Sequence, residues 1–128
     1  MISVTPIYLA LTALLYVALT MRVVKGRMAA KAIYGDGEDA DLRQRIRAHG
    51  NCSEYAPILI LLLLCAELQG TPAWVLHIFG ALILASRMGH AYWMSQVPEP
   101  VGKRQITMAT TFGLLIFLAF GNLAHALF

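Results

Sequence analysis

A helical repeat places several polar side chains of residues 43–58 on one face of an otherwise apolar segment. Arg43, Arg47, Asn51 and Glu54 lie at positions i, i+4, i+8 and i+11, which an α-helix turns to the same side. Guanidinium groups bind carboxylates through paired hydrogen bonds. The pattern therefore favours a pocket for a small ligand with more than one negative charge.

Two other apolar segments also carry basic groups. Arg87 and His90 are three residues apart, and Lys103 and Arg104 open the last segment. One interpretation is a polar contact that only ties helices together, with Glu54 as its carboxylate. However, several arginines facing one carboxylate leave a surplus of positive charge that such a contact does not need. The set as a whole is therefore more typical of an anion-binding site.

The composition indicates the elements that must position these groups. The chain has 128 residues, of which 59% are hydrophobic and 13% charged, whereas soluble domains are about half apolar and about a quarter charged. A soluble domain of this size buries only about two thirds of its surface, so it could not hide so many apolar groups. The numbers also exclude a disordered chain and a two-domain protein. They predict a small polytopic membrane protein.

Long stretches with little or no charge locate four transmembrane helices, because a bilayer core needs about 20 mostly apolar residues per helix. We expect these helices near residues 3–25, 44–68, 72–95 and 104–127, within a single domain of residues 1–128. The segments are too long for the strands of a membrane barrel, which have about ten residues. The predicted fold is all-α, an integral-membrane four-helix bundle with up-down topology.

The distribution of basic residues predicts the orientation, since positive residues prefer the cytoplasmic side. The turn 67–72 has one Glu and no base, which places it outside, and the turn 97–105 brings Lys103 and Arg104 back inside. We therefore expect the N-terminus outside, with the loop between helices 1 and 2 and that between helices 3 and 4 cytoplasmic. No soluble basic face remains for nucleic acid. The charge-free residues 1–21 are followed by the basic residues that place the first loop inside, namely Arg22, Lys25, Arg27 and Lys31.

No pattern in the sequence predicts a metal site. Cys52 and Cys65 have no histidine or second cysteine pair at zinc-ligand spacing. The acidic run GDGEDAD lacks the ligand spacing of a calcium loop. Its plainer interpretation is a turn at residues 35–37, followed by Asp39 or Asp41 as the cap of the second helix.

At RAHGNCSEYAPI the sequence resembles the MAPEG family, the membrane-associated proteins in eicosanoid and glutathione metabolism, and most of all its short bacterial members. Segment number, segment length and inferred topology are similar over nearly the whole chain. The resemblance implies a homotrimer of four-helix subunits that binds glutathione between neighbouring subunits near the cytoplasmic face. The residues that carry it are Arg47, Ala48, His49, Asn51, Glu54, Tyr55 and Pro57.

Carried over position by position, the resemblance implies two roles. One is stabilisation of the glutathione thiolate by Arg104, which makes Arg104 the expected catalytic residue. The other is glutathione binding, implied for Arg22, Arg47, Asn51, Glu54, Arg87 and His90. The chain departs from the family where Gly50 replaces an arginine of several eukaryotic members and where Met94 and Met108 replace tyrosines.

The charges fit the chemistry of glutathione, which has two carboxylates, one ammonium and a thiol. A thiol with a pKa near 8.5 is mostly protonated at pH 7, and a neighbouring cation lowers that pKa. A shift of two units needs about 2.7 kcal/mol of preferential interaction with the anion. Arg104 could supply it electrostatically, but it cannot act as the general base because a guanidinium does not lose its proton.

Three functions stay open at this point. The leading hypothesis is a membrane-bound, glutathione-dependent transferase that joins the thiolate to apolar electrophiles, as in detoxification, with peroxidase activity as a variant. The second is a non-catalytic membrane protein that binds lipid or glutathione. The third is a small transporter, which the clustering of charge at one face disfavours. The expected partners are glutathione, a lipophilic substrate, membrane lipid and further copies of the chain, in a bacterial inner membrane.

Overall fold

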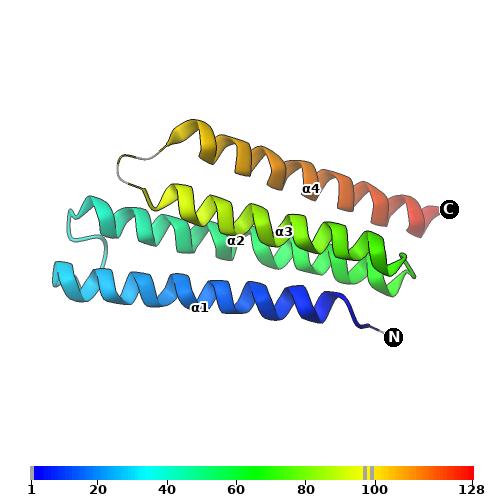
Figure 1. Ribbon diagram of the computed structural model, residues 1–128, viewed down its shortest axis with the longest axis horizontal. Helices are drawn as coiled ribbons and strands as arrows, with labels where there is room; N and C mark the ends of the chain where they lie inside the picture. Colours follow the sequence, from blue (N-terminus) through cyan, green and yellow to red (C-terminus); the bar gives the residue numbers. More distant parts are fainter. Residues whose placement is uncertain (1, 97, 99) are drawn as a thin grey trace.

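Four antiparallel helices make up the computed structural model, which describes residues 2–96, 98 and 100–128. The helices are α1 (Thr5–Ala30), α2 (Ala40–Leu68), α3 (Ala73–Met94) and α4 (Val101–Leu127). Successive helices run in opposite directions and are joined at alternate ends of the bundle (Figure 1). The predicted all-α, up-down four-helix architecture is confirmed.

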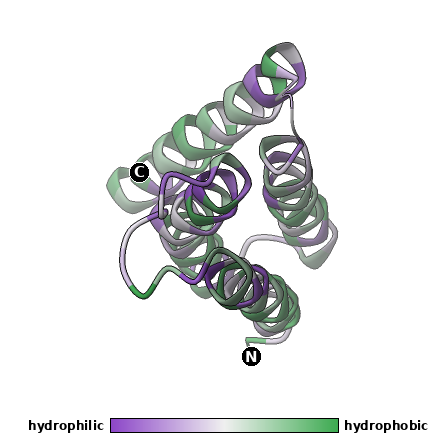
Figure 2. Cartoon of the chain, turned by 90° about the vertical axis from the view of Figure 1, so that its left-hand side faces the viewer, coloured by the Kyte–Doolittle hydropathy of each residue, from purple (hydrophilic) through white to green (hydrophobic). Residues whose placement is uncertain are grey.

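The α2 and α3 helices form the middle of the bundle. Each of them packs against both outer helices, whereas α1 and α4 do not contact each other in the part of the chain that the structure describes. Viewed from one end, α1 and α4 lie on opposite sides of the central pair (Figure 2). Polar groups on the inner faces of α2 and α3 can therefore be shielded from lipid on both sides.

Three helices extend further than their apolar stretches predict, because helices continue into the charged residues beyond the bilayer core. The α1 helix ends at Ala30 rather than near residue 25, α2 begins at Ala40 rather than 44, and α4 begins at Val101 rather than 104. The α3–α4 turn includes residues 97 and 99, which lie outside the described residues, so its predicted position is described only in part.

The α1–α2 connection has the predicted turn and cap. Gly35 and Gly37 adopt positive φ angles of 64° and 57°, which glycine tolerates because it has no Cβ. Asp39 caps α2, since its Oδ1 accepts a hydrogen bond of 2.7 Å from the backbone N–H of Leu42. Of the two candidate caps, Asp39 is the one used.

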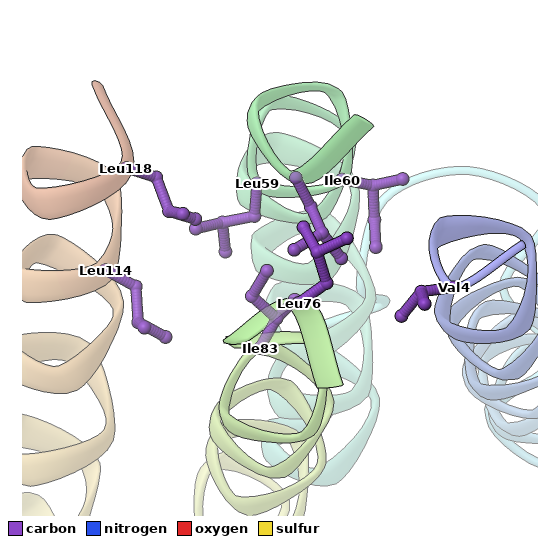
Figure 3. Close-up of a cluster of buried hydrophobic side chains, with 8 residues drawn as sticks. Val4, Leu59, Ile60, Leu76, Ile83, Leu114 and Leu118 are labelled. Atoms are coloured by element: carbon purple, nitrogen blue, oxygen red, sulfur yellow. The ribbon is translucent and has the colours of Figure 1, made fainter. Parts of the chain in front are cut away.

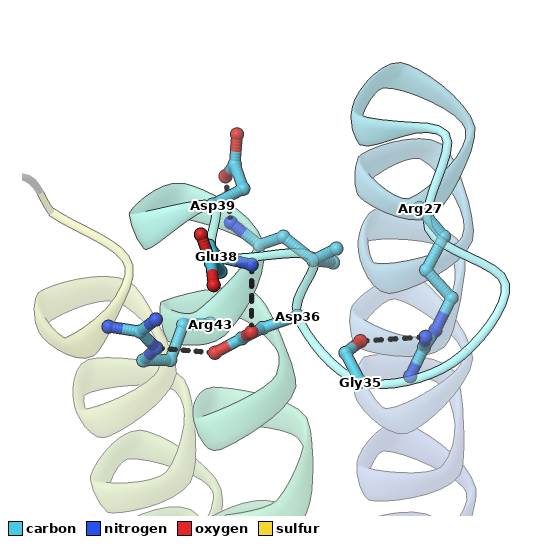
Figure 4. Close-up of polar contacts among 7 residues, drawn as sticks. Arg27, Gly35, Asp36, Glu38, Asp39 and Arg43 are labelled. Carbon is cyan, nitrogen blue, oxygen red and sulfur yellow. Dashed lines mark hydrogen bonds and ion pairs between the residues drawn. The ribbon is translucent and has the colours of Figure 1, made fainter.

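Polar contacts close this connection (Figure 4). Arg27 Nη1 donates to the Gly35 carbonyl oxygen over 2.8 Å, and Arg43 Nε donates to Asp36 Oδ2 over 2.5 Å. The hydrogen bond from Arg43 lowers the pKa of the Asp36 carboxyl below its ordinary value, with help from the Glu38 backbone N–H. Two of the basic residues at this end, which we call the basic end, therefore hold the loop.

The apolar core lies toward the opposite end, which we call the Glu67 end because α2 finishes there. Leu59, Leu63 and Ile83 have no exposed surface, and they pack with residues of all four helices (Figure 3). In a bilayer the alternative surroundings of these side chains are equally apolar lipid tails, so close van der Waals packing stabilises the cluster. The cluster consists of Val4, Leu59, Ile60, Leu63, Leu76, Ile83, Leu114 and Leu118.

Large apolar side chains also cover the outside of the bundle. Leu14, Phe117 and Phe120 are exposed by 66%, 63% and 68%, and such surface is unusual on a protein surrounded by water. By length and composition, three helices among the described residues could cross a membrane, namely α1, α2 and α4. The fourth predicted span, α3, is not among them. Its Arg87 and His90 reduce its apolar character, and both are buried inside the bundle.

Glu67 caps the start of α1 from the far end of α2. Its Oε1 accepts from the backbone N–H groups of Ser3 and Val4 over 2.6 and 2.7 Å, and its Oε2 accepts from that of Thr5 over 2.7 Å. These donors have no partner within a helix, and the Val4 side chain makes no cap hydrogen bond. The carboxylate thus ties the first turn of α1 to the last turn of α2.

A close approach of α1 and α3 occurs at the same end. The Tyr8 ring lies over Gly80, where an added Cβ would stand 2.2 Å from the ring. The Tyr8 hydroxyl donates to the His77 carbonyl oxygen over 3.0 Å. Gly80 is therefore required for this approach.

We predict that Gly80→Ala destabilises the bundle by about 1–3 kcal/mol, because the methyl group displaces the Tyr8 ring from α3. The matched control is Gly113→Ala on α4, where nothing lies within 4 Å of an added Cβ. Thermal unfolding in detergent, followed by circular dichroism, checks both variants. Equal melting temperatures for the two variants would show that the packing of the Tyr8 ring on α3 does not require a glycine at position 80.

Candidate functional site

Arg87 lies at the centre of a buried polar cluster between α2, α3 and α4. Its side chain is among the most buried in the chain, with 1% of the residue exposed. Nη1 donates to Asn51 Oδ1 over 2.7 Å, Nη2 donates to Thr111 Oγ1, and the guanidinium stands 5.5 Å from the centre of the Tyr55 ring. Within residues 2–96, 98 and 100–128, the ion pairs do not include Arg87.

The hydrogen bond from Arg87 fixes the orientation of the Asn51 amide. Because Oδ1 accepts from Arg87, Nδ2 must point the other way, and it donates to Met108 Sδ over 3.6 Å. A thioether sulfur is a weak acceptor. The Asn51 N–H groups are therefore ready to bind a stronger acceptor, such as a ligand carbonyl or carboxylate.

Arg47 and Glu54 lie on the exposed side of α2, whereas Asn51, which their spacing predicts on the same face, is buried. Both side chains are exposed on the isolated chain, and neither forms a hydrogen bond or ion pair with another of the residues that the structure describes. At 1.5 Å per residue, Glu54 lies roughly 20 Å from the start of α2. Two opposite charges thus project from a helix that is apolar enough to span a bilayer.

The other predicted site residues are spread over three helices. His90 is buried on α3 one turn from Arg87, whereas Arg104 is half-buried in the first turn of α4. Arg22 is half-buried on α1, and its carbonyl oxygen accepts from Arg45 Nη1 over 3.2 Å. Since α1 and α4 do not meet, one subunit does not bring Arg22 and Arg104 into direct contact.

The structure therefore divides the predicted set. It brings Asn51 and Arg87 into direct contact. It also buries His90, three residues after Arg87 on α3, but it leaves Arg47 and Glu54 on the surface of the chain. Arg87 Nη1 and Nη2 donate to neighbours within the chain and orient Asn51, whereas the buried Arg87 Nε has no hydrogen-bond partner among the described residues.

Thr111 and Tyr55 complete the cluster and were not among the predicted site residues. A signal for Thr111 is present in the sequence, because residues 104, 107, 108 and 111 follow one another on one face of a helix. Its hydroxyl accepts from Arg87 and donates to the Thr107 carbonyl oxygen over 2.8 Å. Tyr55 in turn meets the Phe112 ring edge-on, with 5.9 Å between the ring centres.

The His49 side chain lies on the side of α2 that packs against α1. Its Nε2 lies 3.1 Å from Thr20 Oγ1, and its ring centre lies 4.6 Å from that of Tyr16. These contacts assign His49 to the packing of α1 on α2.

An apolar groove of about 560 Å³ runs between α1 and α2. Its walls are almost entirely apolar and include Leu9, Ala56 and Ile60, while Tyr16 and Ser53 are among its few polar residues. Ser53 lines the groove and Glu54 does not, because successive residues of an α-helix lie about 100° apart around its axis.

The described residues include no group of three or more His, Cys, Asp or Glu side chains arranged to hold a metal ion. Cys52 and Cys65 are both free thiols; Cys52 is buried and Cys65 is exposed on the outside of α2. The polar cluster is thus built from arginine, amide and hydroxyl groups, which bind anions and carbonyl oxygens rather than metals.

We predict that Thr111→Val destabilises the protein by about 1–3 kcal/mol, because it leaves a buried Arg87 N–H without an acceptor. The matched control is Thr110→Val, whose exposed hydroxyl only donates to the Ile106 carbonyl oxygen. Thermal unfolding of both variants in one detergent separates the effects. Equal melting temperatures of Thr111→Val and Thr110→Val would show that the buried Arg87 side chain does not need the Thr111 hydroxyl as an acceptor.

Two comparisons place this architecture among known proteins. The sequence pattern of the MAPEG family matches residues 5–124. The chain is also 37% identical, over 120 residues, to "Inner membrane protein YecN" of Escherichia coli strain K12, covering 94% of this chain and 90% of that protein. The same figures hold for the YecN protein of Escherichia coli O6:H1. The chain is a multi-pass integral membrane protein, and it belongs to the MAPEG family.

Proposed function

We propose that this protein is a glutathione-dependent transferase of the bacterial inner membrane. The observation that carries the proposal is the charged face of α2. Arg47 and Glu54 are exposed on a membrane-spanning helix beside the buried pair of Asn51 and Arg87. A charge at mid-depth of a bilayer costs about 2.5–3.5 kcal/mol, so this face needs polar partners from outside the chain.

Glutathione has the groups that this face lacks. Arg47 would bind a carboxylate, Glu54 would accept hydrogen bonds from the ammonium group, and Asn51 would turn its N–H groups from Met108 to a carbonyl or carboxylate oxygen. Arg22 and His90 would complete the contacts. Glutathione supplies the nucleophilic thiol, and the family often uses this molecule.

A second subunit would cover the rest of the face. Arg22 on α1 and Arg104 on α4 do not meet within one chain, so a site that uses both needs a neighbouring copy, and we propose a homotrimer. The basic residues at the end of α1 and the start of α2 support a cytoplasmic basic end and an external N-terminus. The inner-membrane location rests on the name of the YecN relatives.

Arg104 would hold the thiol in its anionic form. A desolvated guanidinium favours the thiolate over the thiol, and Arg104 is half-buried at the start of α4. An apolar electrophile, or a lipid hydroperoxide in the peroxidase variant, would reach the thiolate from the bilayer. The groove between α1 and α2 supports this route because it is apolar and lies between two helices that are long and apolar enough to cross a membrane.

A non-catalytic protein that binds lipid or glutathione is the second candidate, and Met108 is the observation that favours it. Its sulfur faces the Asn51 amide at a position where many family members have a tyrosine hydroxyl. Met94, also in place of a tyrosine, is buried in the bundle. Gly50 likewise contributes no charge. These three residues leave fewer polar groups to hold the peptide.

Glutathione binding to the purified protein in detergent is the first prediction of this proposal. We expect Arg47→Ala and Glu54→Ala each to weaken the affinity roughly tenfold or more, since each removes a charge-assisted hydrogen bond. Arg45→Ala is the matched control, because Arg45 is an arginine of α2 that pairs with Asp41 over 2.6 Å. Isothermal calorimetry measures the three affinities.

Equal affinities for all three variants would show that the charged face of α2 does not bind glutathione. Absence of binding by the parent at millimolar glutathione would favour the lipid-binding alternative. The mass of the purified protein–detergent complex, measured in parallel, tests the proposed trimer, and a monomer that binds glutathione would contradict the site between subunits.

Arg104→Ala should reduce turnover much more than affinity, because the guanidinium acts on the thiolate. At pH 7, a rise of the thiol pKa from about 6.5 to about 8.5 lowers the thiolate fraction, and with it kcat, roughly 25-fold, while the glutathione affinity should fall by less than about tenfold. The ultraviolet absorbance of bound thiolate should disappear in the same variant. Equal losses of kcat and affinity would assign Arg104 to binding alone.

A further inference from the structure

The α1–α2 connection, residues 31–39, folds back along α1 and does not extend beyond the end of that helix (Figure 1). Because the side chains of an α-helix point toward its N-terminus, the Arg27 guanidinium reaches back from the basic end along α1. Its Nη1 donates to the carbonyl oxygens of Ile33 over 3.3 Å and Gly35 over 2.8 Å. Gly35 therefore lies on the bilayer side of Arg27, as the close-up of these contacts shows (Figure 4).

The charge pattern of α1 gives the depth of this connection in a membrane. Residues 1–21 have no charged side chain, and Arg22 is the first charged residue after them. A hydrocarbon core of about 30 Å takes about 20 helical residues, and the headgroup layer outside it is about 5–7 Å thick. The edge of the core thus lies near Arg22, and Arg27 lies roughly 7 Å beyond it. Gly35 and its neighbours, on the bilayer side of Arg27, fall within the headgroup layer.

Two large side chains next to Gly35 point away from the protein. Ile33 and Tyr34 are exposed by 81% and 89%. Tyrosine combines an apolar ring with a polar hydroxyl, and it is enriched where a membrane meets water. An exposed isoleucine beside it is favourable in contact with acyl chains and unfavourable in water. The pair is therefore suited to the boundary between headgroups and acyl chains.

Contacts with both helices hold the connection in this position. The Ala32 backbone N–H donates to the Arg27 carbonyl oxygen over 3.0 Å, and Asp36 pairs with Arg43 over 2.5 Å. The two halves of the connection also touch, since a Cβ added at Gly37 would stand 3.0 Å from the Ala32 Cβ. The fold thus determines which two side chains face outward.

Exposed lysines flank this pair. Lys25 lies on α1 between the edge of the hydrocarbon core and Arg27, and Lys31 follows the last residue of α1. Both are exposed, and neither forms an ion pair with another of the described residues. Most carboxylates of this region are engaged within the chain, namely Asp36 by Arg43, Asp41 by Arg45 and Asp39 by the first turn of α2. The surplus of positive charge attracts anionic lipid headgroups.

We propose that the α1–α2 connection is a docking surface for anionic phospholipid. Ile33 and Tyr34 insert among the headgroups of the leaflet at the basic end, and Lys25 and Lys31 select headgroups with a net negative charge. The surface lies apart from the charged face of α2, and it does not depend on the glutathione proposal.

Quenching of a fluorescent label by spin-labelled lipid tests the depth of the connection in nanodiscs. The label is attached to Ile33→Cys in a chain with Cys65→Ala, which keeps Tyr34, and the same chain without the added cysteine corrects for label on buried Cys52. Ala40→Cys is the matched control, because Ala40 is exposed and begins α2 beside Asp39, which lies farther from the bilayer than Gly35 (Figure 4). We expect a nitroxide on the lipid headgroup to quench the label at position 33 roughly twofold or more as strongly as that at position 40.

The same label measures lipid selectivity. Phosphatidylglycerol and phosphatidylcholine, each with a nitroxide at the same place on the acyl chain, are added in turn to phosphatidylcholine nanodiscs. The phosphatidylglycerol quencher should act roughly twofold or more as strongly at position 33, because the lysines concentrate anionic lipid there. Lys25→Gln with Lys31→Gln should remove this preference. Lys103→Gln is the matched control, since Lys103 is an exposed lysine of the basic end on α4, which does not contact α1.

Three results would overturn the proposal. Equal quenching at positions 33 and 40 by the headgroup nitroxide would place the connection outside the headgroup layer. Equal quenching at position 33 by the two chain-labelled lipids would contradict the selection of anionic lipid. A label at position 33 that neither lipid nitroxide nor aqueous iodide quenches would be covered by protein, that is, by a second copy of the chain.

Discussion

The buried guanidinium of Arg87 is the constraint on which the rest of the bundle depends. A full charge without a carboxylate nearby needs neutral acceptors in a bundle of apolar helices. Arg87 Nη1 and Nη2 have them, whereas its Nε has none among the described residues. Asn51 and Tyr55 approach it from α2 and Thr111 from α4, so three helices must adopt one rotation and one register to complete the cluster. The same contact orients the Asn51 amide. A group that is costly to bury thus aligns the helices and prepares a donor for a ligand.

The apolar packing of the bundle and its polar groups lie toward opposite ends of the helices. Toward the Glu67 end, Leu59, Leu63 and Ile83 form an apolar core without exposed surface, and the close contact of Tyr8 with Gly80 holds α1 there. Toward the basic end, hydroxyl and amide groups replace the core, and charged side chains extend outward from α2. The polar half can vary with the ligand because the apolar half carries the packing.

Local features could be predicted from the sequence, and features that depend on helix rotation could not. Charge-free stretches located the helices, side-chain spacing placed Arg47 and Glu54 on one face, and the residue types predicted the Asp39 cap. Periodicity does not say how the helices are rotated against one another, so the sequence placed Arg87 among the grouped polar residues but missed its partner Thr111. That rotation is decided by contacts between residues far apart in the chain.

The cap that Glu67 places on α1 bears on the order in which the chain can mature as it is synthesised. The first turn of α1 receives acceptors for three of its backbone N–H groups only from a residue more than sixty positions later. Until that residue has been synthesised, the leading end of the first helix has no internal partner for these groups. The first two helices thus mature as a pair: the hairpin, rather than the single helix, is the smallest unit whose Glu67 end is complete.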